Sequence, residues 1–585
     1  MFMKKLHKNS FFKAEDGAVM VVAVVCLIAF LSLTSLVTDM GLKYYQKSRL
    51  QSAMDSAALA AAKYMPDEGK AKTVALEYVE KNGFSTESVV VEFPGDDIVR
   101  VSDKIEARTI FASLFKVNSV QIYAKAAAKY IDRNVSVDVD YLMFHGDCIP
   151  FTLGGHYNIG GSIFGNGNVH ADGGAGSKIT GTVFSSQAAS CNPNSVSVGG
   201  VKSHVGYQKM PEYDEMIMTV VPVVNESMFE KTYTPISATA RYINRYSSDT
   251  NIESVLSLNG STYCNGNLTT GWNSELMTIY GDLYVTGNFE PQCPVYVTGN
   301  VYCGGNLTTA WDKTFKVGGN LYVAGNTSFQ GTTTIYGNYF YTGGNLTRGS
   351  TYLLTCECET YIGDNAILSG PTDFKGTVYC RGNLQKQGST TMKVSGNIYA
   401  YRKLDIQSGG AYINGDIYVY GKGLSSSEAV TTICGPMTLK GDIYNRTGKL
   451  ELSGQGTYLI KGVVYSGGSI YTNQGSNGIT LSGCVIAEED ICIGGSTHTY
   501  NEEGGTLSIY SRNGNVVLYS QQGGFDVWGM IYAPNGDVNL ASGDFDIHGS
   551  IIGNTITCMP GGLSMSYNDR ALPFGSTVKT SVLVE

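Results

Sequence analysis

Histidine is rare in this chain, with seven residues among 585. Neither the H-E-x-x-H pattern of zinc hydrolases nor the G-x-S-x-G pattern of serine hydrolases occurs. His156 in GGHYNIGG and Asp490 in AEEDI could each suggest a site, but a solvated turn or strand face explains both more simply. We therefore predict that the protein is not an enzyme and that it has no catalytic, cofactor-binding or metal-ligating residues.

Charged residues are also few, at 16% of the chain, and the formal net charge is −9. We expect no nucleic acid partner. The stretch Ala18–Thr38 has 21 residues and no formal charge, and several lysines precede it. That length can cross a bilayer, so we predict a cytoplasmic leader over residues 1–17 and a transmembrane helix over 18–38. A cleaved secretory signal is the alternative, but the stretch is long for one and no A-x-A-like site follows it directly.

The positions of several cysteines argue against a disulfide framework and a zinc site. The chain has 13 cysteines, of which Cys26 lies in the predicted span. Cys303 and Cys380 occupy positions where related segments have Val, which favours core packing as free thiols. Cys356 and Cys358 are too close together and too isolated to supply four zinc ligands. At least one disulfide remains the alternative, because twelve cysteines lie beyond the span.

Glycine and tyrosine are abundant, with 72 and 39 residues. They recur as Gly, a turn-forming or small residue, an aliphatic residue and Tyr, at Gly281, Gly299, Gly319, Gly376, Gly396, Gly415, Gly441, Gly462 and Gly529. Looser copies begin at Gly161, Gly181, Gly337, Gly483 and Gly549. A period near 20 residues indicates a solenoid. We predict a mainly β fold, a parallel β-helix of roughly 15–18 coils and ~70–85 Å in length at ~4.8 Å per coil.

The residues after each repeat glycine alternate between two directions, as in a β-strand. The aliphatic positions are predicted to form one inward ladder of Leu283, Val301, Leu321, Val378, Ile398, Ile417, Ile443 and Val464. The tyrosines have the opposite phase and are predicted to form an outward stripe of Tyr284, Tyr302, Tyr322, Tyr379, Tyr399, Tyr418, Tyr444 and Tyr465. The stripe either stabilises strand register by stacking or forms a partner-binding surface, since Tyr suits interfaces.

Gly-Asn pairs mark a second corner of the predicted coil. Several Asn-x-Ser/Thr sequences coincide with this corner, among them Asn267, Asn306, Asn326 and Asn345. Asn tolerates turn conformations and hydrogen-bonds to nearby backbone. We therefore interpret these sequences as turns of the repeat and not as glycosylation sites.

The segment DMGLKYYQKSRLQSAMDSAALAAA follows the uncharged stretch. With DGAVMVVAVVCLIAF before it, this segment resembles the N-terminal region of TadG-like and TadE-like proteins of the Tad (Flp) pilus-assembly systems. The matching positions are Asp39, Gly41, Arg49, Leu50, Gln51, Ala53, Asp55 and 57–62. TIFASLFKVNSVQIYAKAAA, which begins at Thr109, extends the resemblance to about residue 132. The resemblance implies a single-pass envelope protein associated with pilus assembly or surface display. The D-x-S-x-S metal site of some members is absent here.

The domain organisation predicted from these features has seven parts. A small α/β stalk module over residues 39–133 follows the leader and the span. The first β-helix coils occupy 134–204, a Pro-containing excursion occupies 205–254, and the main β-helix occupies 255–562. The last part, 563–585, leaves the repeat and is expected to cap the open end of the solenoid or to form a tail.

Three functions are compatible with this organisation. The favoured one is a membrane-anchored, surface-exposed structural protein of Tad/Flp-type pilus assembly or adhesion, with its C-terminal bulk outside the cell membrane. Its partners would be the lipid bilayer, through Ala18–Thr38, and pilus-assembly components, cell-wall glycan or other copies of itself. The alternatives are an envelope-tethered carbohydrate-active β-helix enzyme and a self-associating, polymer-forming scaffold. Carboxylates clustered on one coil face would favour the enzyme, and an uncapped terminal coil would favour the scaffold.

Overall fold

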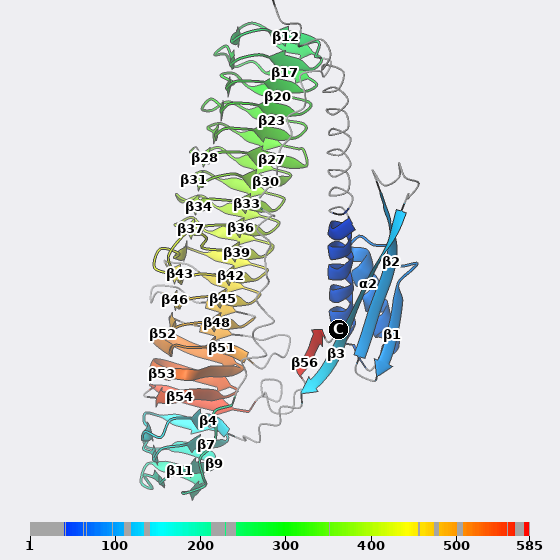
Figure 1. Cartoon of the computed structure of the whole chain (residues 1–585). Helices are drawn as coiled ribbons and strands as arrows, with labels where there is room; N and C mark the ends of the chain where they lie inside the picture. Colours follow the sequence, from blue (N-terminus) through cyan, green and yellow to red (C-terminus); the bar gives the residue numbers. More distant parts are fainter. Residues whose placement is uncertain are drawn as a thin grey trace, which may run out of the picture. The chain divides into compact units, whose positions relative to one another are not determined.

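The structure is a computed structural model of the whole chain (Figure 1). It describes residues 40, 43–62, 64–65, 67–95, 98–109, 119–133, 141–211, 229, 242–349, 351–453, 457–472, 479–481, 483–495, 497–499, 507–558, 560–567 and 578–583. The chain forms two compact units, Met1–Ser136 with Gly575–Glu585, and Val137–Phe574. The predicted transmembrane helix Ala18–Thr38 lies outside the described residues. Within the residues that the structure describes, no helix combines the length and the apolar character needed to span a membrane.

The first unit is an α/β module. A helix covers residues 43–62, and α2 (Glu68–Lys81) follows it. The side chain of Asp67 caps α2, because it accepts a hydrogen bond of 3.0 Å from the backbone N–H of Lys70. Small residues such as Ala53 and Ala57 are buried with strand residues in one core. The alanine-rich run that carries the family resemblance therefore forms a closely packed helix face.

The module contains an antiparallel sheet with a strand from the far end of the chain. Its order is β1 (Val90–Gly95), β2 (Ile98–Arg108), β3 (Ser119–Arg133) and β56 (Val578–Leu583). β3 pairs along one part with β2 and along another with β56. The solenoid is thus inserted between two neighbouring strands of the module. The structure differs from the prediction that residues 563–585 cap the solenoid. β56 lies within these residues and pairs with β3 in the sheet of the first unit.

The second unit is a parallel β-solenoid of 52 strands, β4 to β55. Each coil has three faces, and most strands are three or four residues long. One face, which carries the repeat tyrosines, contains β12 (Asn244–Tyr246), β15 (Thr262–Cys264), β18 (Leu283–Val285), β21 (Val301–Cys303), β24 (Leu321–Val323), β27 (Tyr339–Thr342), β30 (Glu359–Ile362), β33 (Val378–Cys380), β36 (Ile398–Ala400), β39 (Ile417–Val419), β42 (Ile443–Asn445), β45 (Val464–Ser466), β48 (Val485–Ala487), β51 (Leu507–Ser511), β4 (Tyr141–His145) and β7 (Ser162–Gly165).

The other two faces follow the same parallel pairing. One contains β13 (Thr250–Ile252), β16 (Leu268–Thr270), β19 (Phe289–Glu290), β22 (Leu307–Thr308), β25 (Thr327–Phe329), β28 (Leu346–Arg348), β31 (Ala366–Leu368), β34 (Asn383–Lys386), β37 (Lys403–Ile406), β40 (Thr431–Cys434), β43 (Leu450–Ser453), β46 (Ile470–Thr472), β49 (Ile491–Gly494), β5 (Phe151–Leu153), β8 (Val169–Ala171) and β10 (Ala189–Cys191). The other contains β14 (Ser257–Asn259), β17 (Met277–Tyr280), β20 (Val295–Val297), β23 (Phe315–Val317), β26 (Thr333–Ile335), β29 (Leu354–Cys356), β32 (Thr372–Phe374), β35 (Met392–Val394), β38 (Ala411–Ile413), β41 (Met437–Leu439), β44 (Tyr458–Ile460), β47 (Ile479–Leu481), β50 (Thr497–Thr499), β55 (Gly562–Ser566) and β6 (Tyr157–Ile159). The longer strands β9 (Ser177–Ser185), β11 (Val196–Lys202), β52 (Val516–Trp528), β53 (Met530–His548) and β54 (Ile551–Cys558) continue around a corner.

The repeat glycines and asparagines build the corners. A Cβ on Gly337 would lie 2.4 Å from the carbonyl carbon of Gly319 in the preceding coil, so only glycine permits this stacking distance. At the Gly-Asn corner, the side-chain oxygen of Asn306 accepts a hydrogen bond of 2.8 Å from the backbone N–H of Asn326. The Asn326 oxygen accepts in the same way from Asn345. The asparagines of these Asn-x-Ser/Thr sequences therefore form hydrogen bonds that hold the corners of neighbouring coils together.

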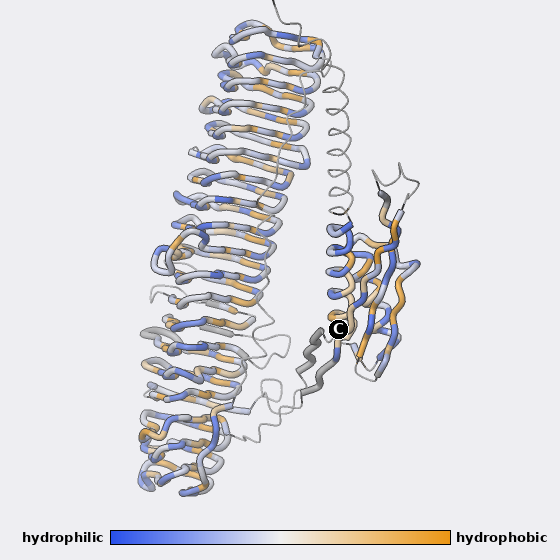
Figure 2. Tube along the Cα trace, viewed as in Figure 1, coloured by the Kyte–Doolittle hydropathy of each residue, from blue (hydrophilic) through white to orange (hydrophobic). Residues whose placement is uncertain are grey.

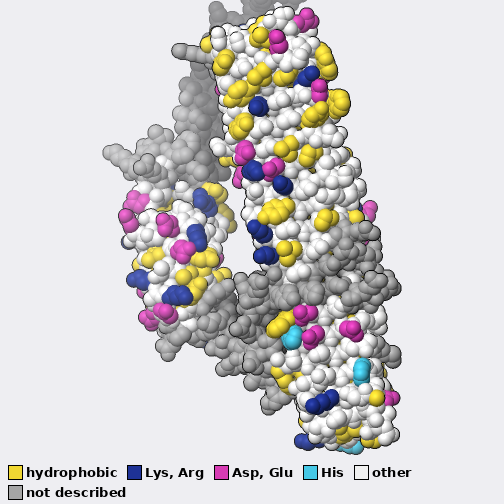
Figure 3. Space-filling view, turned by 180° about the vertical axis from the view of Figure 1, so that it is seen from behind, with side chains coloured by type: hydrophobic (Ala, Val, Ile, Leu, Met, Phe, Trp, Pro, Cys, Tyr) yellow, Lys and Arg dark blue, Asp and Glu magenta, His cyan; other side chains and the backbone are white. Residues whose placement is uncertain are grey.

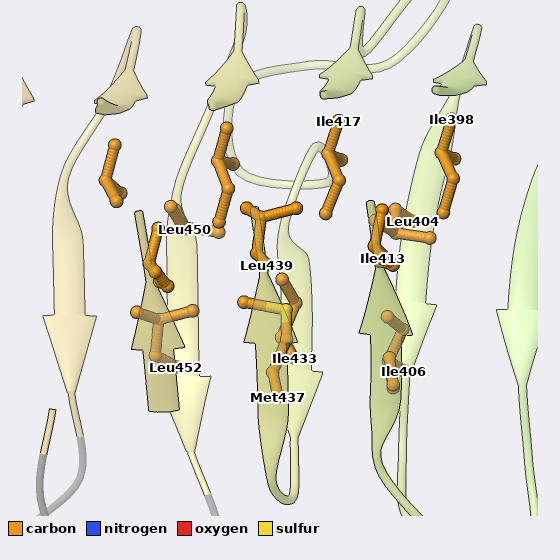
Figure 4. Close-up of a cluster of buried hydrophobic side chains, with 14 of the residues drawn as sticks. Ile398, Leu404, Ile406, Ile413, Ile417, Ile433, Met437, Leu439, Leu450 and Leu452 are labelled. Carbon is orange, nitrogen blue, oxygen red and sulfur yellow. The ribbon is translucent and has the colours of Figure 1, made fainter. Parts of the chain in front are cut away.

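The inward ladder predicted from the repeat is confirmed. All eight of its aliphatic residues are at most 1% exposed, and neighbours such as Ile398, Ile417 and Ile443 pair in register. The close-up in Figure 4 shows Ile398 and Ile417 side by side in the interior. Apolar residues recur along the coils in Figure 2 because each coil contributes the same positions to one continuous core.

The core also contains a buried cation, Arg348. Its side chain is fully buried, and Nη1 donates a bond of 2.9 Å to the carbonyl oxygen of Phe329. Nε and Nη2 have no partner among the described residues. Burial lowers the pKa of the guanidinium to about 10. Lys386, also buried, differs because its ammonium donates to three backbone carbonyl oxygens.

We expect Arg348→Met to stabilise the solenoid by about 1–3 kcal/mol, because it removes two unsatisfied donors from an apolar site. The matched change Lys386→Met should destabilise, since it leaves three carbonyl oxygens without their donor. Denaturant unfolding of both variants measures the difference. The native-state pKa is depressed from 12.5 to about 10, so the gain from Arg348→Met should be constant below pH 10 and shrink as the pH rises from there. A lower stability of Arg348→Met than of the unmodified chain would contradict the interpretation that the unsatisfied donors of Arg348 destabilise the core.

The coils do not stack in the order of the sequence. The first block, β4 to β11, follows the last coil of the main block: β4 and β5 pair with β54, and β6 pairs with β55. Figure 1 shows the cyan β4 next to the red β54, whereas the green β12 lies at the opposite end. The main block begins at Asn244, before the predicted residue 255, and β55 extends it to Ser566. The open end predicted after the last coil is therefore covered by the first block.

Candidate functional site

The eight tyrosines predicted as a partner-binding stripe lie on one face of the solenoid. Tyr284 pairs in register with Tyr302 and Tyr302 with Tyr322, and the other five form a second unbroken run from Tyr379 to Tyr465. The ring centroids of Tyr399 and Tyr418 are 4.8 Å apart, with the planes at 5°. We call this surface the tyrosine face. The repeat spacing predicts its membership because every tyrosine follows its glycine by the same number of residues.

The tyrosine face is less exposed than the sequence predicts. Tyr302, Tyr399, Tyr444 and Tyr465 are buried, at 6 to 9% exposure, and the other four tyrosines are half-buried. Stacking explains part of this burial, because each ring covers the faces of its neighbours along the column. The stripe therefore lies outside the inner core, as predicted, but it is not a row of freely exposed rings.

Carboxylates hold several of the tyrosine hydroxyls. Tyr444 Oη donates a hydrogen bond of 2.7 Å to Asp442, which lies two residues before it in the same repeat. Tyr418 Oη donates in the same way to Asp416, at 2.9 Å. Burial raises the pKa of Tyr302 and of Tyr465 to about 12. The hydroxyls of these two tyrosines are therefore neutral at physiological pH.

The segment between the two blocks of coils contacts the tyrosine face at separate levels. We call residues 205–242 the connector, of which the structure describes 205–211, 229 and 242. The centroid of the Phe229 ring lies 6.4 Å from that of Tyr399, edge to face. The centroid of the Tyr242 ring lies 6.2 Å from that of Tyr284. Part of the predicted binding surface is therefore occupied by the chain itself.

The N-terminal end of the connector, residues 205–211, is bound to the solenoid by hydrogen bonds. The backbone N–H of Gln208 donates to Asn166 Oδ1 at 2.9 Å, and Asn166 Nδ2 donates to the Gln208 carbonyl at 2.8 Å. Tyr532 Oη donates to the carbonyl oxygen of Pro211. Asn166 and Tyr532 belong to different blocks, so the described part of the connector contacts both blocks.

Several residues of this face are absent from the predicted stripe. Tyr263, Tyr361, Tyr510 and Tyr532 continue the same column, as do Phe144 and Phe164 in the first block. The repeats contain part of the signal, since Phe164 stands in the tyrosine position of the looser copy GSIF and Tyr532 in that of the regular copy GMIY. Phe229 has no repeat around it, so periodicity could not identify it.

A shallow groove of about 570 Å³ lies on another face and crosses the junction of the two blocks. Asp526, Asp544, Asp546 and His156 are among the residues that line it. His548 Nε2 lies 4.0 Å from an oxygen of Asp526 and 3.6 Å from one of Asp546. Figure 3 shows acidic side chains and histidines close together on the lower coils. His156, interpreted from the sequence as part of a solvated turn, is exposed but contributes to this groove.

The remaining sequence candidates have structural explanations. Asp490 Oδ1 accepts the backbone N–H of Asn515 at 2.8 Å, so it is a member of a corner ladder. The twelve described cysteines are free thiols. Burial raises the pKa of the Cys303 thiol to about 11, which is consistent with a core residue. Among the described residues, no group of three or more His, Cys, Asp or Glu is placed to hold a metal ion.

Comparison with known proteins identifies one region. Residues 17–63 match the model of the Tad family, the Flp pilus-assembly TadE/G-like family. No curated protein matches the chain. No solved structure matches it either. The matched region contains the uncharged stretch and the alanine-rich helix, and the solenoid follows it along the chain. The chain therefore carries a TadE/G-like pilus-assembly domain at residues 17–63 and a parallel β-solenoid over residues 141–566.

Proposed function

We propose that this chain is a membrane-anchored, surface-exposed structural protein of Tad/Flp-type pilus assembly or adhesion, which displays the solenoid as a rigid rod. The observation that carries the proposal is the match of residues 17–63 to a pilus-assembly family in a chain whose bulk is a solenoid. The 21 uncharged residues Ala18–Thr38 supply an anchor of sufficient length. In this proposal the leader is cytoplasmic and the solenoid lies outside the membrane.

The rod would act by contact and not by catalysis. Its tyrosine face supports this role, because half-buried tyrosines such as Tyr322 and Tyr379 combine apolar area with a polar edge. The connector occupies parts of that face, so a partner would bind where the rings remain accessible. The partner classes are pilus-assembly components, cell-wall glycan and other copies of the chain.

Extraction of membranes with alkaline carbonate tests the anchor. We expect the full chain to remain in the membrane pellet, and a variant with Val24→Arg and Ile28→Arg to be released. Release of the unmodified chain into the soluble fraction would overturn the proposal. The assembly role requires a second readout, the number of pili per cell in strains with and without the protein. Unchanged piliation would restrict the function to adhesion or display.

One observation favours a second candidate function, an envelope-tethered carbohydrate-active enzyme. Asp526 and Asp546 occupy neighbouring coils in register and flank His548 beside the groove. Paired carboxylates are the usual catalytic groups of glycoside hydrolysis. Release of reducing sugar from envelope polysaccharide by the purified chain, lost in Asp526→Asn and Asp546→Asn, would support this candidate. Equal release by the chain and both variants, or none, would exclude this site.

A further inference from the structure

The junction between the two blocks of coils is formed by segments that are about four hundred residues apart in the sequence. We call it the joint: β4, β5 and β6 on one side, β54 and β55 on the other. Gly146 N–H donates to Gly553 O at 2.9 Å, and Asp147 N–H donates to Asn554 O at 2.7 Å. Leu563 N–H donates to His156 O at 2.8 Å. The joint thus has the backbone ladder of any two stacked coils, without a direct chain connection across it.

At the joint, a histidine side chain accepts one of the backbone N–H groups. His145 is 1% exposed, at the end of β4. Its Nδ1 accepts a hydrogen bond of 3.0 Å from the backbone N–H of Ile556 in β54. A backbone N–H can only donate, so Nδ1 must be unprotonated and the ring proton of the neutral form lies on Nε2. Nε2 has no partner among the described residues.

The surroundings of His145 are unfavourable to a cation. Its ring stacks on Phe151 of β5, with centroids 5.1 Å apart. The charged groups that act on it are Asp147, in the turn after β4, and Asp537, from β53. Both carboxylates and the backbone of Ile149 favour protonation, but burial outweighs them and lowers the pKa of His145 below its ordinary value. The neighbours from β7 and β54 in contact with it contribute backbone groups and no charge.

Other histidines of the solenoid provide an internal comparison. Nδ1 of His170 lies 2.8 Å from Ser190 Oγ, and Nδ1 of His548 lies 2.8 Å from Ser566 Oγ. A hydroxyl can donate or accept, so these contacts persist when the ring gains a proton. His145 faces a fixed donor, and protonation would place two donors against each other in a buried site.

We propose that the joint is an acid-sensitive closure, in which protonation of His145 separates β54 from β4 and loosens the first block of coils from the last coil of the main block. The opened joint exposes His145 to water, where it binds a proton at its ordinary pKa near 6.5. Acid therefore favours the open form. As the pH falls below 6.5, the open population should rise about tenfold per pH unit until His145 also protonates in the closed form.

Hydrogen exchange of the full-length protein in detergent, followed by mass spectrometry between pH 5 and 8 and corrected for intrinsic rates, tests this proposal. Peptides from β4 and β54 should lose protection below pH 6.5, whereas peptides from β24 and β27 should not. His145→Asn supplies an acceptor oxygen that cannot protonate, so it should remove the acid response. His548→Asn is the matched control and should leave the response unchanged.

Two results would overturn the proposal. One is equal protection of the joint peptides at pH 5 and pH 7 in the unmodified chain. The other is an acid response that persists in His145→Asn. If His145→Asn does not fold, hydrogen exchange of the unmodified chain alone tests the proposal. A local effect of His145 should lower the protection of the joint peptides at a higher pH than that of the β24 and β27 peptides.

Discussion

Ile417→Asp should destabilise the solenoid by several kcal/mol. Ile417 is fully buried and lies in register between Ile398 and Ile443, so the change removes an apolar side chain and adds a carboxyl group without a partner. The carboxyl group would be held in its neutral form or would draw water into the core. Denaturant unfolding of the purified protein measures the loss of stability.

Tyr418→Asp, one position further along, is the matched control. Tyr418 stacks on Tyr399 and Tyr444, with centroids 4.8 and 5.3 Å away, so its loss should cost about 1–3 kcal/mol for two aromatic contacts. The new carboxylate would also lie near Asp416. Because position 418 is only half-buried, this cost should remain below that of Ile417→Asp. If Tyr418→Asp were the more damaging change, the assignment of inward and outward positions would be wrong.

Phe229→Ala should detach the middle of the connector from the tyrosine face. The Phe229 side chain is 9% exposed and contacts Tyr399, Tyr401 and Tyr420. Replacing a buried phenylalanine by alanine costs about 3–5 kcal/mol in a protein core. Because Phe229 packs on the outer surface of the solenoid and not in its core, the cost of Phe229→Ala should lie at the lower end of that range. Limited proteolysis should therefore cut the connector of Phe229→Ala at least tenfold faster than that of the unmodified chain.

Tyr207→Ala is the control for this experiment. Tyr207 belongs to the same connector, but its side chain is 65% exposed. Its removal should leave the cleavage rate unchanged. Equal cleavage rates in Phe229→Ala and Tyr207→Ala would show that Phe229 does not hold the connector on the tyrosine face.

The repeat allows much of the solenoid to be predicted, because its signals are local. The glycine at Gly337 is required by contact with the coil before it, and Ile417 and Tyr418 take opposite directions through strand alternation. These relations depend on a fixed spacing, which a sequence displays directly. The asparagine ladder at Asn306 and Asn326 is predictable for the same reason.

The order of the coils could not be predicted from the sequence. Any coil can stack on any other through backbone hydrogen bonds, so the pairing of β4 with β54 has no signature in the repeat. The pairing of β56 with β3 could not be predicted either, because it depends on where the chain leaves the solenoid. Phe229 has no repeat around it, and His145 lies in a coil that lacks the repeat glycine, so the contacts of these residues carry no periodic signal.

Cysteine labelling of intact cells tests whether the solenoid is displayed outside the membrane. Ser426 is exposed in a turn of the solenoid, so Ser426→Cys provides a target, with Cys148→Ser to remove the one exposed thiol among the described cysteines. A membrane-impermeant maleimide should label Ser426→Cys as fully in intact cells as in lysed cells. Labelling only after lysis would contradict display of the solenoid outside the membrane.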